Sequence, residues 1–231
     1  MSADRVEPAP QRRSSVISYL ELRQGIGIVG TALPFVLALG NAFLRSVLLA
    51  APHWRGWDLQ SSMSGYYYTD MSNVFVGALC VIGVFLISYK GENRTEAWAG
   101  DIAGFAAVGV GLFPTYEPNG PMTVIGDVHI AFAAVLYLTL ACFSLLLFPR
   151  GENVLAHRRI VRNRVYRICG WTIVACITGI AVVSIPGISH DVASYKPAFW
   201  FESGATVAFG VSWLTKGQRI FRDRATGADR N

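Results

Sequence analysis

One apolar stretch decides the fold class of this chain: residues Val128–Phe148 read VHIAFAAVLYLTLACFSLLLF. The stretch contains no Asp, Glu, Lys or Arg. A helix of about 20 mostly apolar residues is long enough to cross the hydrocarbon core of a bilayer, which is about 30 Å thick. A helix on a soluble protein would carry a polar stripe at a spacing of about 3.6 residues, and this stretch has almost none. It therefore predicts a transmembrane helix.

Five further stretches of similar length and composition flank it. They are Gly25–Leu44, Ser72–Tyr89, Ala97–Pro114, Ile168–Ile185 and Phe199–Leu214. The sequence thus predicts an all-α fold, a polytopic membrane bundle of six transmembrane helices. In this prediction residues 16–217 form the bundle, residues 1–15 are a disordered N-terminal tail, and residues 218–231 are a basic C-terminal tail.

The basic residues fall almost entirely on one side of the predicted bundle. Of the 20 Lys and Arg residues, all but Arg45, Arg55 and Lys196 lie in the two tails or in the second and fourth loops. Because cytoplasmic loops are enriched in Lys and Arg, this distribution predicts a protein of the cell inner membrane with both termini in the cytoplasm. Anionic lipid headgroups suffice as partners for the net charge of +5, and no nucleic-acid partner is expected.

The fourth loop, Arg150–Arg167, is rich in arginine. We expect it to lie against the inner leaflet, where basic side chains attract anionic lipid. The predicted headgroup contacts are Arg158, Arg159, Arg162 and Arg164. A loop that only enforces topology is an equally good interpretation. Membrane lipids are thus the predicted partners, with a homo-oligomer left open.

The third predicted helix has small residues at regular spacing. Ala99, Ala103, Ala107 and Gly111 recur every four residues, with Gly100 and Gly104 beside them. Small residues let helix backbones approach closely in lipid. We favour tight helix packing over a cavity-lining role for them, because such patterns are common.

Polar residues at membrane depth are the candidates for chemistry. If the second helix begins near Met63, then Tyr66, Asp70, Asn73 and Gly77 share one face that descends from the outer surface. Asp127 and His129 open the fourth helix at the same level, and Glu202 is in the first turns of the sixth. The predicted ligand- or ion-binding set of the outer cavity is Tyr66, Tyr68, Asp70, Asn73, Asp127, His129, Trp200 and Glu202.

An ionisable side chain in hydrocarbon costs at least about 2.5 kcal/mol, so it is usually paired or functional. We expect Asp70, His129 and Glu202 to converge on one ion, one water or one another. A divalent metal on these three residues is possible, and no other cofactor is expected. The alternatives are structural: Asp70 and Asp127 as helix N-caps, His129 as an interfacial histidine, and the aromatic residues as an interfacial belt. For Asp127 we favour the cap, and for Glu202 a functional role.

Six strings along the chain form a recognisable set. They are Ser64–Thr69, Asn73–Gly77, Gly111–Thr115, Arg164–Trp171 and Phe209–Gly217, together with Tyr89-Lys90-Gly91. This set resembles a group of bacterial six-helix integral membrane proteins and covers most of the chain. The resemblance implies a fold and no activity.

A more distant resemblance is to the superfamily of alkaline ceramidases and progestin/adipoQ receptors, which are seven-helix bundles with a zinc-dependent lipid-amide hydrolase site. Their second helix has a Ser and a His four residues apart, and here Ser64 matches the Ser while Tyr68 takes the His position. Their third-helix Asp corresponds at best to Asp101, which lies at the cytoplasmic end. Their last helix has two His, where this chain has Glu202 as its ionisable group. This chain therefore lacks the three zinc-binding His residues of that superfamily and has one predicted helix fewer.

Two classes of function remain open. The first is a channel, transporter or sensor of a small cation or small molecule, with a polar cavity open to the outside. The second is a membrane-embedded lipid hydrolase with a non-standard metal or acid/base site built from Asp70, His129 and Glu202. The first class needs no residue that the chain lacks. Motifs for nucleotide binding, a serine-hydrolase elbow and a zinc protease are missing.

Overall fold

The structure is a computed structural model that describes residues 19–48, 59–118, 120–150 and 156–217. Within these ranges the chain is helical and contains no strand. The six long helices are α1 (Tyr19–Phe43), α2 (Ser72–Ser88), α3 (Arg94–Leu112), α4 (Val124–Cys142), α5 (Ala156–Val183) and α7 (Pro197–Lys216). Short helices complete the described chain: α6 (Ile188–Val192), two π-helices at Leu44–Leu48 and Phe143–Leu147, and three 3₁₀-helices at Ser64–Tyr68, Phe148–Arg150 and Ala193–Tyr195. The predicted tails, 1–15 and 218–231, lie outside the described residues.

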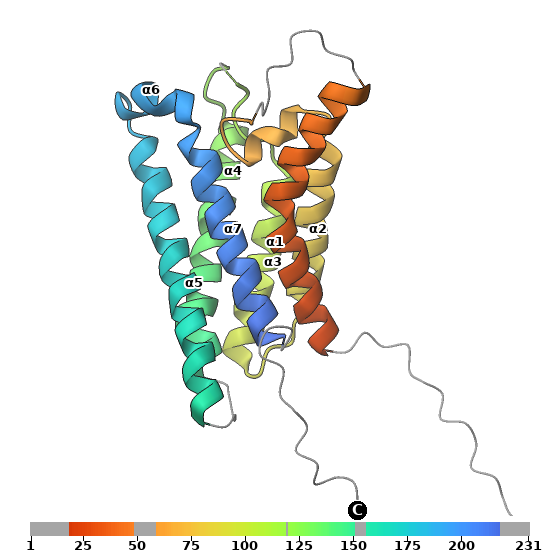
Figure 1. Ribbon diagram of the computed structural model, residues 1–231, viewed down its shortest axis with the longest axis vertical. Coiled ribbons are helices and arrows are strands. Elements are labelled where there is room, and N and C mark those ends of the chain that lie inside the picture. Colours follow the sequence, from red (N-terminus) through yellow and green to blue (C-terminus); the bar gives the residue numbers. More distant parts are fainter. Residues whose placement is uncertain (1–18, 49–58, 119, 151–155, 218–231) are drawn as a thin grey trace, which may run out of the picture.

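The six long helices form a closed ring (Figure 1). Following the ring, α1 packs against α2, α2 against α3, α3 against α4, α4 against α5, α5 against α7, and α7 against α1. The first turn of α1 and the last turn of α7 lie at the same end of the ring, which we call the termini end. The short helix α6 lies at the other end, the α6 end.

Three of the helical segments are long and apolar enough to cross a membrane: Leu20–Val47, Val124–Leu147 and Arg159–Val183. Ser72–Ser88 is a shorter apolar helix. Many large apolar side chains face outward from the ring, among them Phe35, Phe105 and Trp171. Only 22% of an apolar 18-residue window within Arg159–Val183 is buried inside the protein. An outward face this apolar is typical of contact with lipid or with another protein.

The helix ends differ from the predicted ones mainly in α5. It begins at Ala156, so the part of the predicted basic loop from Ala156 to Arg167 is helical. Hydropathy finds the apolar centre of a helix and misses its polar ends. Arginine has a high helix propensity, so the helix continues through this basic stretch.

The condition that the second helix begins near Met63 is not met, and the helix instead begins where the predicted stretch Ser72–Tyr89 begins. Residues Ser64–Tyr68 form a separate 3₁₀-helix, and α2 begins only at Ser72. At the break, the Thr69 hydroxyl donates to the Tyr66 carbonyl oxygen and accepts from the Met71 amide, which replaces helical hydrogen bonding. Tyr66 is therefore buried, while Asp70, Asn73 and Gly77 are exposed, and the four residues share no continuous face.

The small residues of α3 serve close packing, as expected. A Cβ atom added to Gly104 would lie 2.7 Å from the Gly83 carbonyl oxygen of α2. One added to Gly100 would lie 2.8 Å from the Leu86 carbonyl oxygen. The backbones of α2 and α3 thus approach to a distance that only glycine permits at these two positions.

Candidate functional site

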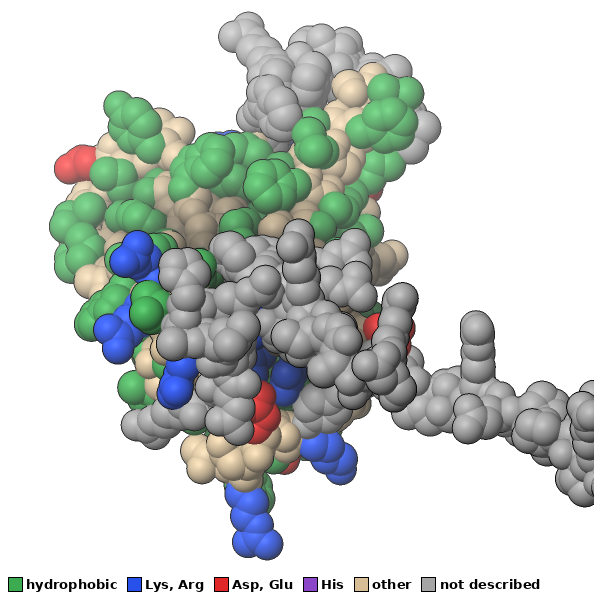
Figure 2. Space-filling view, turned by 60° about the horizontal axis from the view of Figure 1, so that its bottom comes forward, with side chains coloured by type: hydrophobic (Ala, Val, Ile, Leu, Met, Phe, Trp, Pro, Cys, Tyr) green, Lys and Arg blue, Asp and Glu red, His purple; other side chains and the backbone are tan. Residues whose placement is uncertain are grey.

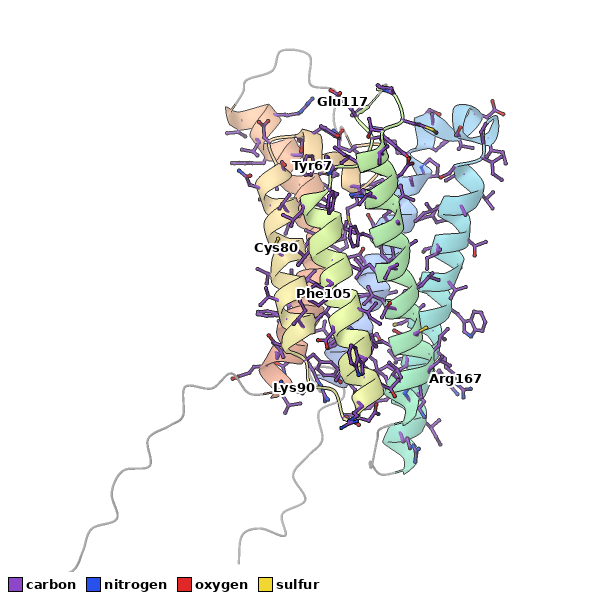
Figure 3. All side chains as sticks on the ribbon, turned by 180° about the vertical axis from the view of Figure 1, so that it is seen from behind. Tyr67, Cys80, Lys90, Phe105, Glu117 and Arg167 are labelled. Carbon is purple, nitrogen blue, oxygen red and sulfur yellow. The ribbon has the colours of Figure 1, made fainter. Side chains whose placement is uncertain are left out.

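A segment between α1 and α2 closes the α6 end of the ring, and we call residues Leu59–Met71 the plug. Its 3₁₀-helix, Ser64–Tyr68, lies across the mouth of the ring (Figure 1), and Figure 3 marks its position by Tyr67. The Phe199 amide of α7 donates to the Ser61 carbonyl oxygen at 3.2 Å. The Tyr66 ring, fully buried, packs against that of Phe199 with centroids 6.1 Å apart. The plug is therefore docked on α7.

Glu202 of α7 holds the first turn of the plug helix. One carboxylate oxygen of Glu202 accepts hydrogen bonds from the backbone amides of Met63 and Ser64, at 2.5 and 3.2 Å. Met63 is the N-cap of this 3₁₀-helix and provides no side-chain cap of its own. A carboxylate at a helix N-terminus satisfies free amides and interacts favourably with the helix dipole. Glu202 thus caps the N-terminus of a helix that is distant from it in the sequence.

His129 of α4 holds the same turn from the other side. Its Nε2 lies 3.0 Å from Ser64 Oγ and its Nδ1 lies 2.7 Å from the Phe113 carbonyl oxygen. Because a carbonyl oxygen only accepts, this network assigns the proton to Nδ1 and makes Nε2 the acceptor of the Ser64 hydroxyl. His129 is 1% exposed. We call Ser64, His129, Glu202 and the Met63 amide the plug cluster.

A small cavity lies beneath the plug cluster. Its volume is about 30 Å³, and it is lined by apolar side chains and by Ser64, Tyr137 and Thr206. The Tyr137 and Thr206 hydroxyl oxygens are 2.9 Å apart, and Thr206 donates to the Glu202 carbonyl oxygen at 2.8 Å. A cavity of this volume has room for at least one water-sized occupant.

The other predicted outer residues do not join the plug cluster. Asp70 and Asn73 are exposed. The Tyr68 hydroxyl donates to the Thr115 carbonyl oxygen at 2.6 Å, and Trp200 is 59% exposed beside Phe199. The structure therefore brings His129 and Glu202 together on Ser64, and leaves Asp70 at the surface.

Asp127 is not the N-cap of α4, contrary to our expectation. Thr123 caps this helix, with its hydroxyl oxygen accepting from the Gly126 amide at 3.1 Å. Asp127 instead accepts a hydrogen bond from the Tyr116 hydroxyl in the α3–α4 connection. That bond stabilises the neutral phenol and raises the pKa of Tyr116.

The plug cluster offers little to a metal ion. Both ring nitrogens of His129 already have partners. The described ranges contain no group of three or more His, Cys, Asp or Glu side chains placed to hold a metal.

A second polar cluster lies at the termini end and was not foreseen. Lys216 at the end of α7 places Nζ 2.8 Å from Glu92 Oε1, and Arg23 of α1 lies 3.4 Å from the same oxygen. Glu96 of α3 accepts from the Tyr89 hydroxyl at 2.8 Å and from the Glu92 amide at 2.9 Å. We call Arg23, Tyr89, Glu92, Glu96 and Lys216 the charge cluster.

Apart from Glu92, whose side chain is 34% exposed, the charge cluster is buried. Glu96, Lys216 and Arg23 are 0%, 3% and 8% exposed. The Lys216 amine lies 5.4 Å from the centre of the Phe148 ring, and the Arg23 guanidinium lies 5.3 Å from that of Tyr89. Buried charges are tolerated only with partners. The cluster therefore fixes the ends of α1 and α7 to the turn between α2 and α3.

One sequence signal could have indicated this cluster. Glu92 and Glu96 are acidic residues within the second loop and the start of the third helix, on the side where the basic residues gather. We counted Arg23 and Lys216 only as topology signals, and we therefore did not predict that both pair with Glu92.

Of the four predicted headgroup contacts, Arg162 was wrong, because it is 2% exposed and faces the interior. Its position on α5 is one turn from Tyr166, which is also buried. Arg159 and Arg164 are exposed. The side chain of Arg158 lies outside the described part of the chain.

Comparison with known proteins identifies no relative: no family model, no curated protein and no solved structure matches this chain. The function is therefore argued from the plug cluster, the charge cluster and the cavity between them.

Proposed function

We propose that this chain is a six-span protein of the inner membrane that gates or senses the passage of a small cation, with the plug as its outer gate. In this proposal both termini are cytoplasmic, the plug faces outward, and the charge cluster faces inward. The observation that carries the proposal is the capping of the plug helix by Glu202, because one titratable carboxylate binds both amides at the start of that helix.

The distribution of basic side chains supports this orientation. Figure 2 shows Lys and Arg side chains gathered around the termini end. Lys90 and Arg167, marked in Figure 3, lie toward that end, opposite Tyr67 of the plug. A positive end of this kind belongs in the cytoplasm by the positive-inside rule.

The chemistry of the cavity favours a cation. The polar groups that line it are hydroxyls of Ser64, Tyr137 and Thr206, and no described lining residue is basic. Hard cations are bound by oxygen ligands. A volume of about 30 Å³ restricts the occupant to an ion or a few water molecules.

Glu202 couples the cation to the gate. A carboxylate accepts stronger hydrogen bonds than a neutral group does. A proton or cation that neutralises Glu202 therefore weakens its bonds to the Met63 and Ser64 amides. The plug then separates from α7 and opens the cavity to the outside.

A flux assay tests this proposal. The full chain is reconstituted in proteoliposomes, and uptake of H⁺, Na⁺ and K⁺ is measured with ion-sensitive dyes. We expect flux of at least one ion, and we expect Glu202→Gln to change that flux about tenfold or more, because the variant keeps the shape and removes the charge. Asp70→Asn is the matched control, since Asp70 is an exposed carboxylate on the same plug. No flux above empty vesicles, or equal effects of the two variants, would contradict the proposal.

A second candidate, hydrolysis of an outer-leaflet lipid ester or amide, is favoured by the Ser64–His129 pair. A serine bonded to the acceptor nitrogen of a histidine that is oriented through its other nitrogen resembles an activated nucleophile. It ranks second because the Glu202 carboxylate occupies the Met63 and Ser64 amides that would otherwise stabilise an oxyanion. A fluorophosphonate probe tests it: labelling of Ser64 that is lost in His129→Gln supports hydrolysis, and no labelling of Ser64 rejects it.

A further inference from the structure

The outward face of α5 carries a groove near the termini end that the proposed gate does not use. The groove is shallow and open to the outside, and all its described lining residues belong to α5. They include Ile160, Arg164, Arg167, Ile168, Trp171 and Ala175. The opposite face of the same helix, with Arg162 and Tyr166, is buried in the ring.

The groove has a basic part and an apolar part. Arg164 and Arg167 are three residues apart, so they lie on one face of the helix, and both are exposed. Neither guanidinium is paired within the described part of the chain. Figure 3 shows Arg167 at the outside of the bundle. Further along the helix, Ile168 and Trp171 are 60% and 64% exposed.

The dimensions of the groove suit one lipid leaflet. From Arg164 to Ala175 the helix rises about 16 Å, which is roughly half of the 30 Å hydrocarbon core. An Arg guanidinium binds phosphate with paired hydrogen bonds. Trp side chains favour the boundary between headgroups and acyl chains.

We propose that this groove binds an anionic phospholipid of the leaflet next to the termini. Its phosphate lies between Arg164 and Arg167, and one acyl chain lies along Ile168, Trp171 and Ala175. A phospholipid is favoured over a second copy of the chain because two unpaired arginines require an anion on the opposing surface, next to an apolar tail. The inference needs only a membrane location and is independent of cation flux.

The test uses the purified full chain in detergent and in phosphatidylcholine nanodiscs, with phosphatidylglycerol added. Native mass spectrometry counts the retained lipid. We expect phosphatidylglycerol to be retained in preference to phosphatidylcholine, and its affinity to fall about tenfold in Arg164→Gln/Arg167→Gln, since each arginine contributes to anion binding. Trp171→Ala should lower it about threefold through lost apolar contact.

The matched control is Lys90→Gln/Arg94→Gln, which removes two exposed charges at the same end. A change below about twofold in this control supports a defined site, because charge lost elsewhere should matter little. Equal loss in both double variants, or no preference for phosphatidylglycerol, would overturn the proposal. Binding of glycerol phosphate at the affinity of the whole lipid would do the same, and a dimer that persists without lipid would assign the groove to a second copy.

Discussion

The two ends of the ring are closed by different chemistry. At the α6 end, side chains of α4 and α7 bind one turn of the plug through a single carboxylate and a neutral Ser–His pair. At the termini end, Arg23 of α1 and Lys216 of α7 both pair with Glu92 in the α2–α3 turn. Glu96 of α3 accepts hydrogen bonds from the Tyr89 hydroxyl and the Glu92 amide. Neutralising Glu202 should therefore weaken the docking of the plug, which keeps the Ser64–His129 hydrogen bond and its contacts with Phe199. In the charge cluster, by contrast, Glu92 keeps one basic partner when the other is neutralised. The comparison indicates a labile α6 end and a rigid termini end.

The largest effect should come from Glu96 in the charge cluster. Glu96→Leu leaves the buried Tyr89 hydroxyl and the Glu92 amide without their acceptor. We expect a loss of about 3–5 kcal/mol, the usual result of removing one partner from a buried charged network. Thermal or denaturant unfolding in detergent measures it, with Glu117→Leu at an exposed position as the control. A loss no greater than that of the control would remove the contrast between the two ends.

Glu202→Gln should cost less stability and act on the plug alone. The amide oxygen still accepts from Met63 and Ser64, but without the charge that strengthens both bonds. We expect a loss of about 1–2 kcal/mol. Hydrogen exchange should show faster exchange in the plug and unchanged exchange in α3, which carries Glu96. Faster exchange at both ends would show that the two clusters are not independent.

Ser64→Ala should have a smaller effect of about 1 kcal/mol, because it removes one neutral hydrogen bond and leaves His129 Nε2 buried without a donor. The α6 end should stay closed, since the capping amides remain. The free energy of unfolding is measured for Ser64→Ala and for the control Ser62→Ala. The Ser62 hydroxyl accepts a hydrogen bond from the Gly65 amide, which lies within the plug. A loss of stability in Ser64→Ala that exceeds the loss in Glu202→Gln would show that the Ser64–His129 pair, and not Glu202, contributes most to holding the plug.

The smallest effect should be the coupling between Lys216 and Glu92. The Glu92 side chain is 34% exposed, so solvent screens this pair. We expect a coupling free energy of about 0.5–1 kcal/mol in a double-mutant cycle of Lys216→Met and Glu92→Gln, decreasing with salt. A coupling near zero would assign the rigidity of the termini end to Glu96 and Tyr89.

The local features of the sequence predicted most of the fold. The apolar stretches marked the six long helices, because a run of about 20 mostly apolar residues can be read directly from consecutive residues. The first turns of α5 were not predicted to be helical, because the polar end of a helix has no hydropathy signal. The plug was missed for a similar reason. Its 3₁₀-helix ends at Thr69 through local hydrogen bonds of the Thr69 hydroxyl, and hydropathy does not detect such a break.

The candidate site was predicted in part. Glu202 and His129 stood out because charged or titratable groups are rare in apolar segments. Ser64 stood out only through the resemblance to the alkaline ceramidase superfamily, and its contacts with His129 and Glu202 were not predicted, because it is distant in the chain from both. Arg162 was misassigned because residues up to Arg167 were expected to form a loop, so a buried helix face at this position was not considered.

The most direct test of the account is the accessibility of the plug interior. Gly65 is buried, and a side chain there would meet only ordinary contacts, the nearest atoms being 3.4 Å from its Cβ. Gly65→Cys is treated in sealed vesicles with a membrane-impermeant thiol reagent from the outside, and the chain without this substitution serves as the blank for Cys80, Cys142, Cys169 and Cys176. We predict slow modification that becomes about tenfold faster with Glu202→Gln, equal to about 1.4 kcal/mol of easier opening, and stays unchanged with Asp70→Asn. Modification that is equally slow in all three backgrounds, or that occurs only from the inside, would contradict the account.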